Sequence, residues 1–160
     1  YKQYEYCKIS TLVINHQMDT RYHQTMLSTH NKEMIPCVQC DTLMGLPDTL
    51  TQEIDSCQAI LINEGQFFPD LLCFVERMMA NNKKVYVAGL DGDFKRNRFG
   101  QMLDLIPLCD KVVKLKSLCG KCRNGQVAIF SMRITEENTQ TLIGSDNYMP
   151  VCRGCYDGNV

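Results

Sequence analysis

Two pairs of cysteines have the spacing of a zinc site. Cys119 and Cys122 form one CxxC pair, and Cys152 and Cys155 form another. Two such pairs supply four thiolates to one tetrahedral Zn²⁺, which leaves no coordination position for a water. About 30 residues separate the pairs, more than the roughly 15–20 of most zinc ribbons, so the segment between them must extend away from the metal site as a structure of its own. The sequence therefore predicts a structural zinc ion. The alternative is two unrelated pairs of free thiols.

The other cysteines, out of ten in the sequence, do not share this arrangement. Cys37 and Cys40 repeat the CxxC spacing, but no further pair remains to complete a second metal site. A redox role for them stays open, although the sequence places no His or basic residue beside them to lower a thiol pKa. The remaining four are predicted to be small buried hydrophobic residues: Cys7, Cys57, Cys73 and Cys109.

Acidic and amide residues follow the apolar run at 59–62, where a strand is predicted. Glu64 can serve as a general base if it lies about 2.6–3.2 Å from an acceptor hydroxyl. An acidic pair at such a place is how nucleotide-binding sheets hold Mg²⁺ and orient a nucleophile. In the later segment 89–96, glycine allows close backbone approach, and Phe94 offers a flat face to a base. Ligands bind at this end of parallel strands, so both segments are candidates for a binding site.

A structural role for both segments stays open as the alternative. In that interpretation they are polar turns between strands and helices, Asp70 is a helix N-cap, and the aromatic rings pack in the core. These aromatic residues are Phe67, Phe68 and Phe94.

The elements that must position these residues alternate between strands and helices. Apolar and β-branched runs predict strands at 11–14, 59–62, 85–89 and 111–115. Helical spacing predicts helices at 70–81 and about 99–105, and a short helix follows Pro47 with Asp48 or Thr49 as its N-cap. The segment up to about Lys32 is polar and is predicted to be a loop. Such alternation is typical of an α/β fold with a parallel sheet.

After Leu118 the pattern changes to short alternating segments. Residues 126–135 and 140–143 predict a β-hairpin between the two cysteine pairs. The chain is therefore predicted to consist of an α/β core over residues 1–118 and a small zinc-bound β lobe over residues 119–160.

Composition excludes several classes of protein. The chain has 17 basic and 18 acidic residues and a net charge of −1, which argues against a protein built to bind a nucleic-acid backbone. Its longest apolar runs are far shorter than the roughly 20 residues of a membrane span. The first residues contain no apolar signal segment, so we expect an intracellular protein.

The run NEGQFFPD at 63–70 resembles the DEGQFFPD signature of the type II thymidine kinase family, the cellular and poxvirus kind. Other segments match that family in the same order over nearly the whole chain. They are similar to its DTRY segment at 19–22, its TH pair at 29–30, its LDGTF…PFG…LxPL stretch at 88–108 and its IGG…Y…VCRxCY segment at 143–156. The resemblance implies a P-loop-kinase-like parallel sheet with flanking helices and a lasso anchored by zinc.

The resemblance also implies an activity, the ATP-dependent transfer of the γ-phosphoryl group to the 5′-hydroxyl of thymidine. Glu64 would be the general base. The region of the ATP phosphates and Mg²⁺ would be formed by Asp19, Arg21, Asn63 and Gln66. Thymidine would be bound by a stacking ring, lasso backbone groups and a closing tyrosine, namely Phe94, Leu142, Ile143, Gly144 and Tyr148.

Three departures from the family pattern stand out. No Gly-x-x-x-x-Gly-Lys-Ser/Thr segment occurs in the sequence, and residues 1–7 match the end of the family's first helix, so we expect the upstream strand and P-loop to be missing and this chain alone to be a poor kinase. Asn63 replaces a charged Asp, which should weaken Mg²⁺ placement. Residues 143–145 lack the second glycine of IGG, and the turn before Tyr148 is one residue shorter than in the family.

These observations leave three hypotheses. The first is most of a thymidine kinase, and the second is a non-catalytic, nucleoside-binding or regulatory relative. The third is a zinc-ribbon interaction module, against which the near-neutral charge weighs. For the first hypothesis, the resemblance further implies a homotetramer, a cytoplasmic location and feedback inhibition by dTTP, with no nucleic-acid or membrane partner.

Overall fold

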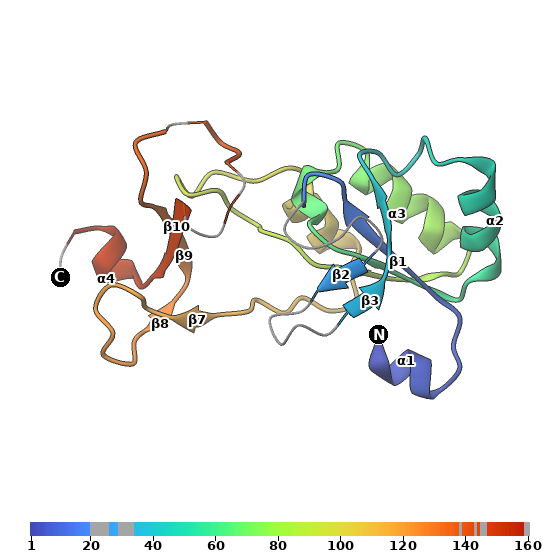
Figure 1. Cartoon of the computed structure of the whole chain (residues 1–160), viewed down its shortest axis with the longest axis horizontal. Coiled ribbons are helices and arrows are strands. Elements are labelled where there is room, and N and C mark those ends of the chain that lie inside the picture. Colours follow the sequence, from blue (N-terminus) through green and yellow to red (C-terminus); the bar gives the residue numbers. More distant parts are fainter. Residues whose placement is uncertain (20–25, 29–33, 138, 143, 145–146, 159–160) are drawn as a thin grey trace. The chain divides into compact units, whose positions relative to one another are not determined.

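The computed structural model describes residues 1–19, 26–28, 34–137, 139–142, 144 and 147–158. It divides the chain into two compact units (Figure 1). Unit 1 comprises Tyr1–Asp91 and Gly100–Leu105, and unit 2 comprises Gly92–Phe99 and Ile106–Val160. The division into domains 1–118 and 119–160 stays a prediction.

Unit 1 contains the expected parallel sheet. Four strands lie in the order β4-β1-β5-β6, and all three pairings between neighbours are parallel. Their bounds are Thr11–His16 for β1, Val38–Cys40 for β4, Ala59–Ile62 for β5 and Lys84–Val87 for β6. The α/β fold class is therefore confirmed.

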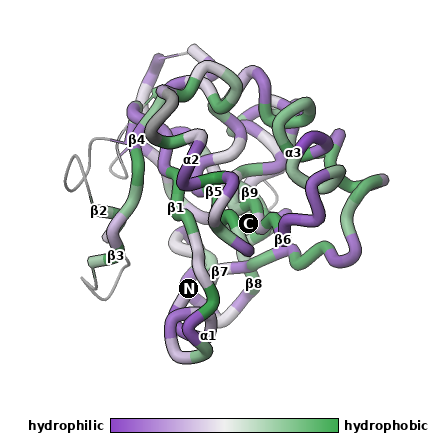
Figure 2. Tube along the Cα trace, turned by 90° about the vertical axis from the view of Figure 1, so that its right-hand side faces the viewer, coloured by the Kyte–Doolittle hydropathy of each residue, from purple (hydrophilic) through white to green (hydrophobic). Residues whose placement is uncertain are grey.

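The two central strands, β1 and β5, are the most buried of the four, and they carry the apolar runs at 12–14 and 59–62 (Figure 2), as expected for strands that are covered on both faces. Helix α3 (Leu71–Ala80) buries one face against this sheet through its apolar residues at helical spacing. The buried residues of that face are Leu71, Phe74, Val75 and Met78. These four side chains pack with Ile60 and Ile62 of β5 in one hydrophobic core, which holds the sheet in place.

Shorter helical elements complete unit 1. They are α1 (Lys2–Tyr6), α2 (Asp48–Ser56) and the 3₁₀ turn η1 (Gly65–Phe67). Helix α2 has Pro47 at its N-cap, so the predicted cap at Asp48 or Thr49 is wrong by one or two residues. The helix expected at about 99–105 is the 3₁₀ helix η2 (Met102–Leu108), which contains Pro107.

The predicted strand at 111–115 is wrong. This segment has no regular structure, and its apolar side chains are largely exposed, with Leu115 at 84%. A β-branched run forms a strand only where a partner completes its hydrogen bonds, and the described strands provide none for it.

Two parts of the sheet region were not predicted. The short strand β4 pairs with β1, Ile14 opposite Val38. The antiparallel strands β2 (Met26–Ser28) and β3 (Met34–Pro36) lie in and just after the segment predicted to be a loop. Three-residue strands with polar or cysteine residues carry too little periodicity to be recognised.

Unit 2 is built from short antiparallel strands. Strand β7 (Ser117–Leu118) pairs with β8 (Val127–Ala128), and β9 (Phe130–Arg133) pairs with β10 (Tyr148–Val151). The predicted hairpin between 126–135 and 140–143 is therefore wrong in its second strand, because the partner of β9 is β10. Val151 at the end of β10 is fully buried beside the cysteines, which fixes this strand in unit 2. Helix α4 (Arg153–Tyr156) follows.

None of the helices among the described residues combines the length and the hydrophobicity that a bilayer crossing needs.

Candidate functional site

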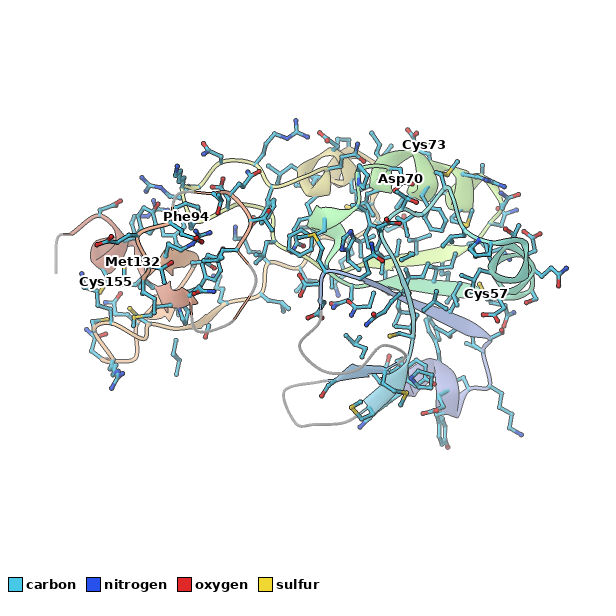
Figure 3. All side chains as sticks on the ribbon, turned by 45° about the horizontal axis from the view of Figure 1, so that its top comes forward. Cys57, Asp70, Cys73, Phe94, Met132 and Cys155 are labelled. Carbon is cyan, nitrogen blue, oxygen red and sulfur yellow. The ribbon has the colours of Figure 1, made fainter. Side chains whose placement is uncertain are left out.

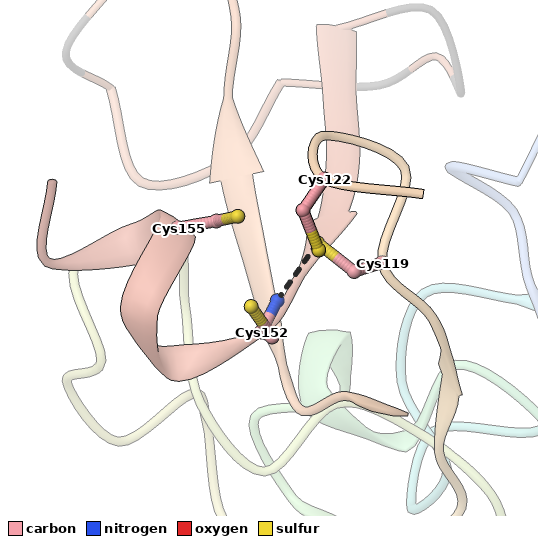
Figure 4. Close-up of side chains that lie close together, drawn as sticks. All are labelled: Cys119, Cys122, Cys152 and Cys155. Atoms are coloured by element: carbon pink, nitrogen blue, oxygen red, sulfur yellow. Dashed lines mark hydrogen bonds between the residues drawn. The ribbon is translucent and has the colours of Figure 1, made fainter. Parts of the chain in front are cut away.

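Four cysteine side chains of unit 2 converge on one point (Figure 4). The Sγ atoms of Cys119, Cys122, Cys152 and Cys155 all lie within 4.8 Å of one another. Zn–S bonds of about 2.3 Å in a tetrahedron place sulfurs roughly 3.8 Å apart, so small shifts would suffice to bind the metal. The donor set and its spacing fit a closed structural Zn²⁺ site, as the sequence predicted.

Hydrogen bonds already favour negative charge in this cluster. Burial disfavours the Cys119 thiolate, but backbone N–H groups of Cys122, Cys152 and Lys121 outweigh it and lower the pKa of Cys119 to about 6. One of these bonds runs from the Cys152 N–H to Cys119 Sγ, 3.3 Å long. Burial and the neighbouring thiols raise the pKa of Cys155 to about 12. A divalent cation supplies the counter-charge that lets all four thiols ionise.

The other cysteines differ from their predicted surroundings. Only Cys57 is buried, whereas Cys7, Cys73 and Cys109 are exposed. Cys73 lies on α3 between the positions that face the core, so its side chain points outward (Figure 3). Burial, together with Asp41 and Asp70, raises the pKa of Cys40 to about 11, which opposes a reactive thiolate there.

In unit 1 the ends of β1 and β5 bring three amide and acidic side chains together. Asn63 Nδ2 donates to Asn15 Oδ1 at 2.9 Å, and Asn15 Nδ2 donates to Asp19 Oδ2 at 3.2 Å. Asn63 and Asp19 were predicted from the sequence to belong to this site, whereas Asn15, which connects them, was not. An aspartate at position 63 could not donate to Asn15, so the amide suits this network. Arg21 lies outside the described residues.

Glu64, two residues after the end of β5, has an unusual backbone conformation. Its φ of 55° and ψ of 40° lie in the left-handed region, which costs a residue with a β-carbon roughly 1–2 kcal/mol. The next residue, Gly65, donates its N–H to Ala88 O at 2.9 Å and begins the turn η1. Strain of this kind clusters at functional sites, where the surrounding structure holds a side chain in place.

Gln66 fixes the carboxylate of Glu64. Its Nε2 donates to Glu64 Oε2 at 2.7 Å, and its Oε1 accepts the N–H of Leu90 at 3.0 Å. Gln66 is 4% exposed and both bonds are partly buried, so water competes with them less than it does at the open surface. Gln66 thus joins the predicted general base to the segment that follows β6.

Gly100→Ala tests this arrangement. Gly100 has φ +54°, and a β-carbon there would lie 2.2 Å from Gln66 O, so the backbone of Gln66 must move. Gly125→Ala is the matched control, because its φ is +84° but nothing lies within 4 Å. We expect Gly100→Ala to lower the free energy of unfolding by about 2 kcal/mol more than the control. Urea denaturation measures this, and equal losses would contradict the assignment.

His16 at the end of β1 predicts a pH dependence of stability. The buried ring packs 4.7 Å from the Phe68 ring, and its Nδ1 accepts the N–H of Met18 at 3.1 Å. Burial lowers the pKa of His16, although Asp41 and Glu64 oppose this effect. The unfolded state therefore takes up a proton first as the pH falls below about 6.5, and stability decreases until His16 itself is protonated in the folded state. His16→Gln should reduce the loss in free energy of unfolding between pH 7.5 and 5.5; an unchanged loss would exclude His16 as its source.

In unit 2, Arg133 lies between two of the predicted thymidine contacts. Its Cζ lies 4.1 Å from the centroid of the Phe94 ring and 4.7 Å from that of the Tyr148 ring. Its Nη2 also donates to Tyr148 Oη at 2.5 Å. The sequence analysis missed Arg133, because a single arginine on a short strand carries no local signal.

The predicted lasso residues are only partly described. Leu142 and Gly144 are half-buried, and Gly144 has φ +126°, a conformation that favours glycine. Gly144 O accepts the N–H of Asn147 at 3.3 Å, which closes a turn before Tyr148. Ile143 lies outside the described residues. The structure thus joins Glu64 to Gln66 and Asn63 to Asp19 in unit 1, and Phe94 to Tyr148 in unit 2.

Asp70 has a different contact from the one expected of a helix cap. It occupies the N-cap position of α3, but its side chain accepts the N–H groups of Leu43 and Met44, at 2.7–3.1 Å. The carboxylate therefore ties the segment after β4 to α3.

Comparisons with known proteins find both a matching family model and similar sequences. A family model described as thymidine kinase matches residues 1–156. The thymidine kinase of Oryza sativa subsp. japonica is 43% identical over 152 residues, which is 92% of this chain and 55% of the rice protein. The thymidine kinase of Vaccinia virus (strain Ankara) is 40% identical over 159 residues, 99% of this chain and 86% of the viral protein. The cytosolic thymidine kinase of Gallus gallus is 36% identical over 156 residues, 97% of this chain and 67% of the chicken protein. The chain thus spans about half the length of the rice relative.

Proposed function

This chain belongs to the thymidine kinase family, and we propose that the protein transfers the γ-phosphoryl group of ATP to the 5′-hydroxyl of thymidine, giving dTMP. Family membership supports a phosphotransferase. The Glu64–Gln66 pair is the observation that carries the proposal, because it presents an oriented carboxylate at the end of a parallel strand, where such sheets bind ligands.

Glu64 acts as the general base in this proposal. Its carboxylate accepts the proton of the 5′-hydroxyl while the hydroxyl oxygen attacks the γ-phosphorus of ATP. The bond from the γ-phosphorus to the bridging oxygen breaks, and ADP leaves with that electron pair. Gln66 holds the carboxylate through Oε2, so its orientation does not depend on bound substrate.

Asp19 would be the charged ligand on the side of the phosphates. Carboxylate and amide oxygens suit Mg²⁺, and the buried Asp19 lies in one hydrogen-bonded network with Asn15 and Asn63. When bound with ATP, the ion neutralises part of the phosphate charge. Since Asn63 is uncharged, Asp19 carries the negative charge of this network. Arg21 would contact the phosphates.

Thymidine would be bound by unit 2. The Phe94 ring would stack on the base, Tyr148 would close the site, and backbone groups of the lasso would read the base edges. These lasso residues are Leu142, Ile143 and Gly144. The zinc site would be structural, because its four thiolates would hold the two ends of the segment that carries these contacts.

Three further properties are proposals from family resemblance alone. They are assembly as a homotetramer, feedback inhibition by dTTP and a cytoplasmic location. The name of the chicken relative supports the last of these.

The direct test is product formation by the full-length protein. Incubated with Mg²⁺, ATP and thymidine, it should form dTMP and ADP in equal amounts, detected by liquid chromatography and mass spectrometry. A zinc-loaded, folded preparation that binds thymidine but forms no dTMP would overturn the proposal in favour of a non-catalytic nucleoside-binding protein.

A further inference from the structure

One hydrogen bond joins the zinc site to the segment that carries Phe94. Tyr156 Oη donates to the carbonyl oxygen of Phe94 at 2.6 Å, although the two residues are 62 positions apart. Tyr156 is the last residue of α4 and directly follows the metal ligand Cys155. Within α4 its N–H donates to the carbonyl of Cys152, another ligand, at 3.0 Å. The position of Tyr156 is therefore set by the cysteine cluster.

A second set of contacts holds Tyr156 against the same segment. The guanidinium carbon of Arg96 lies 4.5 Å from the centroid of the Tyr156 ring, and Arg96 Nη1 forms a 3.0 Å salt bridge with Asp157. The Tyr156 ring also packs against the Phe130 ring, with centroids 5.2 Å apart. The salt bridge is partly exposed and contributes little by itself. The half-buried hydroxyl of Tyr156 makes the direct contact with the backbone at Phe94.

Several hydrogen bonds of Asp93 brace the segment 92–99 around Phe94. Asp93 Oδ1 accepts the N–H groups of Lys95 and Asn97, each at 2.8 Å, and its Oδ2 accepts Gln140 Nε2 at 2.9 Å. Burial disfavours the Asp93 carboxylate, but these hydrogen bonds outweigh it and lower the pKa of Asp93. A shift at the Phe94 carbonyl therefore moves the Phe94 ring rather than bending a loose loop.

We propose that Tyr156 is a positioning residue, which transmits the geometry of the zinc site to the Phe94 ring and so sets the affinity for the nucleoside. This inference rests on the proposed function, in which Phe94 contacts the base. The metal would then influence the affinity for the nucleoside as well as stabilise the fold. The Tyr156 hydroxyl would transmit this influence.

Tyr156→Phe removes only this hydroxyl and keeps the ring against Arg96 and Phe130. In the full-length, zinc-loaded protein we expect the Kd and the KM for thymidine to rise by about threefold to tenfold, the range of one net hydrogen bond. The KM for ATP and the bound zinc, measured by native mass spectrometry, should stay at the wild-type values. Tyr6→Phe is the control, because Tyr6 is 90% exposed.

Comparison of Tyr156→Phe with Phe94→Ala distinguishes failure of the positioning role of Tyr156 from failure of the proposed role of Phe94 in binding thymidine. Phe94→Ala should weaken thymidine binding at least as much as Tyr156→Phe, and the double variant should lose no more than Phe94→Ala alone. An unchanged thymidine Kd in Tyr156→Phe, with a weakened one in Phe94→Ala, would overturn the positioning role only. Equal rises in the KM for thymidine and for ATP, or loss of zinc, would show a merely structural role and would also overturn it. An unchanged Kd in Phe94→Ala would overturn the proposed role of Phe94 itself.

Discussion

Glu64→Gln is expected to lower kcat for phosphoryl transfer by about 10²–10⁴-fold, the range that general-base catalysis supplies. The amide has nearly the same shape as the carboxylate, and its oxygen can still accept the bond from Gln66 Nε2. It cannot take up the proton of the 5′-hydroxyl. The fold and the affinity for thymidine should therefore stay at the wild-type level, so that kcat falls without a rise in KM.

Steady-state kinetics of the full-length protein, with thymidine binding measured by calorimetry, checks this expectation. Glu76→Gln is the matched control, since Glu76 is exposed on α3 and the same charge is removed. If Glu64→Gln retained wild-type kcat, another group would have to be the base. A large rise in the thymidine Kd with little change in kcat would instead assign Glu64 to binding.

Cys155→Ser is expected to abolish zinc binding and to unfold the surroundings of the cysteine cluster. Cys155 is 1% exposed and packs with Val151 and Cys152, so the buried core of unit 2 consists largely of the ligands themselves. The free energy of binding Zn²⁺ to such a site is about 10–16 kcal/mol in small zinc domains, far more than this core can replace. Native mass spectrometry should show no bound zinc, and amide hydrogen exchange should become fast over β9 and β10.

Cys73→Ser provides the control for loss of a thiol, because Cys73 is exposed on α3 and outside the cluster. Exchange in β5 should remain slow in both variants, since its core is formed by Ile60, Phe68 and Phe74 in unit 1. Slow exchange over β9 and β10 in a zinc-free Cys155→Ser protein would contradict the view that metal holds this lobe together.

The parts of the fold that the sequence predicted are those with strong local patterns. The runs at 11–14 and 59–62 became β1 and β5 because both lie inside the sheet, where continuous apolar residues are required. The run at 111–115 is also rich in β-branched and apolar residues, although it contains Lys111 and Lys114, but it has no strand beside it among the described residues. Periodicity reports what a segment can form, and pairing depends on residues elsewhere in the chain.

In the candidate functional site, too, only residues with a local sequence pattern could be predicted. The cysteine cluster was predictable because two short CxxC turns each bring their own pair of sulfurs together. Asn15 and Arg133 were missed because their importance lies in contacts that no spacing encodes, such as the bond between Asn63 and Asn15, 48 positions apart. The residue types and the family resemblance both suggested roles for Glu64 and Phe94, but neither indicated the contacts that hold these side chains in place.

The topology of unit 1 also has a consequence for the rate of folding. Every pairing in its sheet joins strands that are distant in sequence, such as Ile14 with Val38, Thr11 with Ala59 and Ala59 with Lys84. No tight hairpin can nucleate a parallel sheet. The entropy cost of closing a long loop must therefore be met before any of these strand pairs gains its hydrogen bonds. Such high contact order places mixed α/β domains between the microsecond folding of helical bundles and the folding of barrels and sandwiches in milliseconds to seconds. During that delay the strands β1 and β5 are unpaired, and their exposed apolar runs favour aggregation as the protein concentration rises.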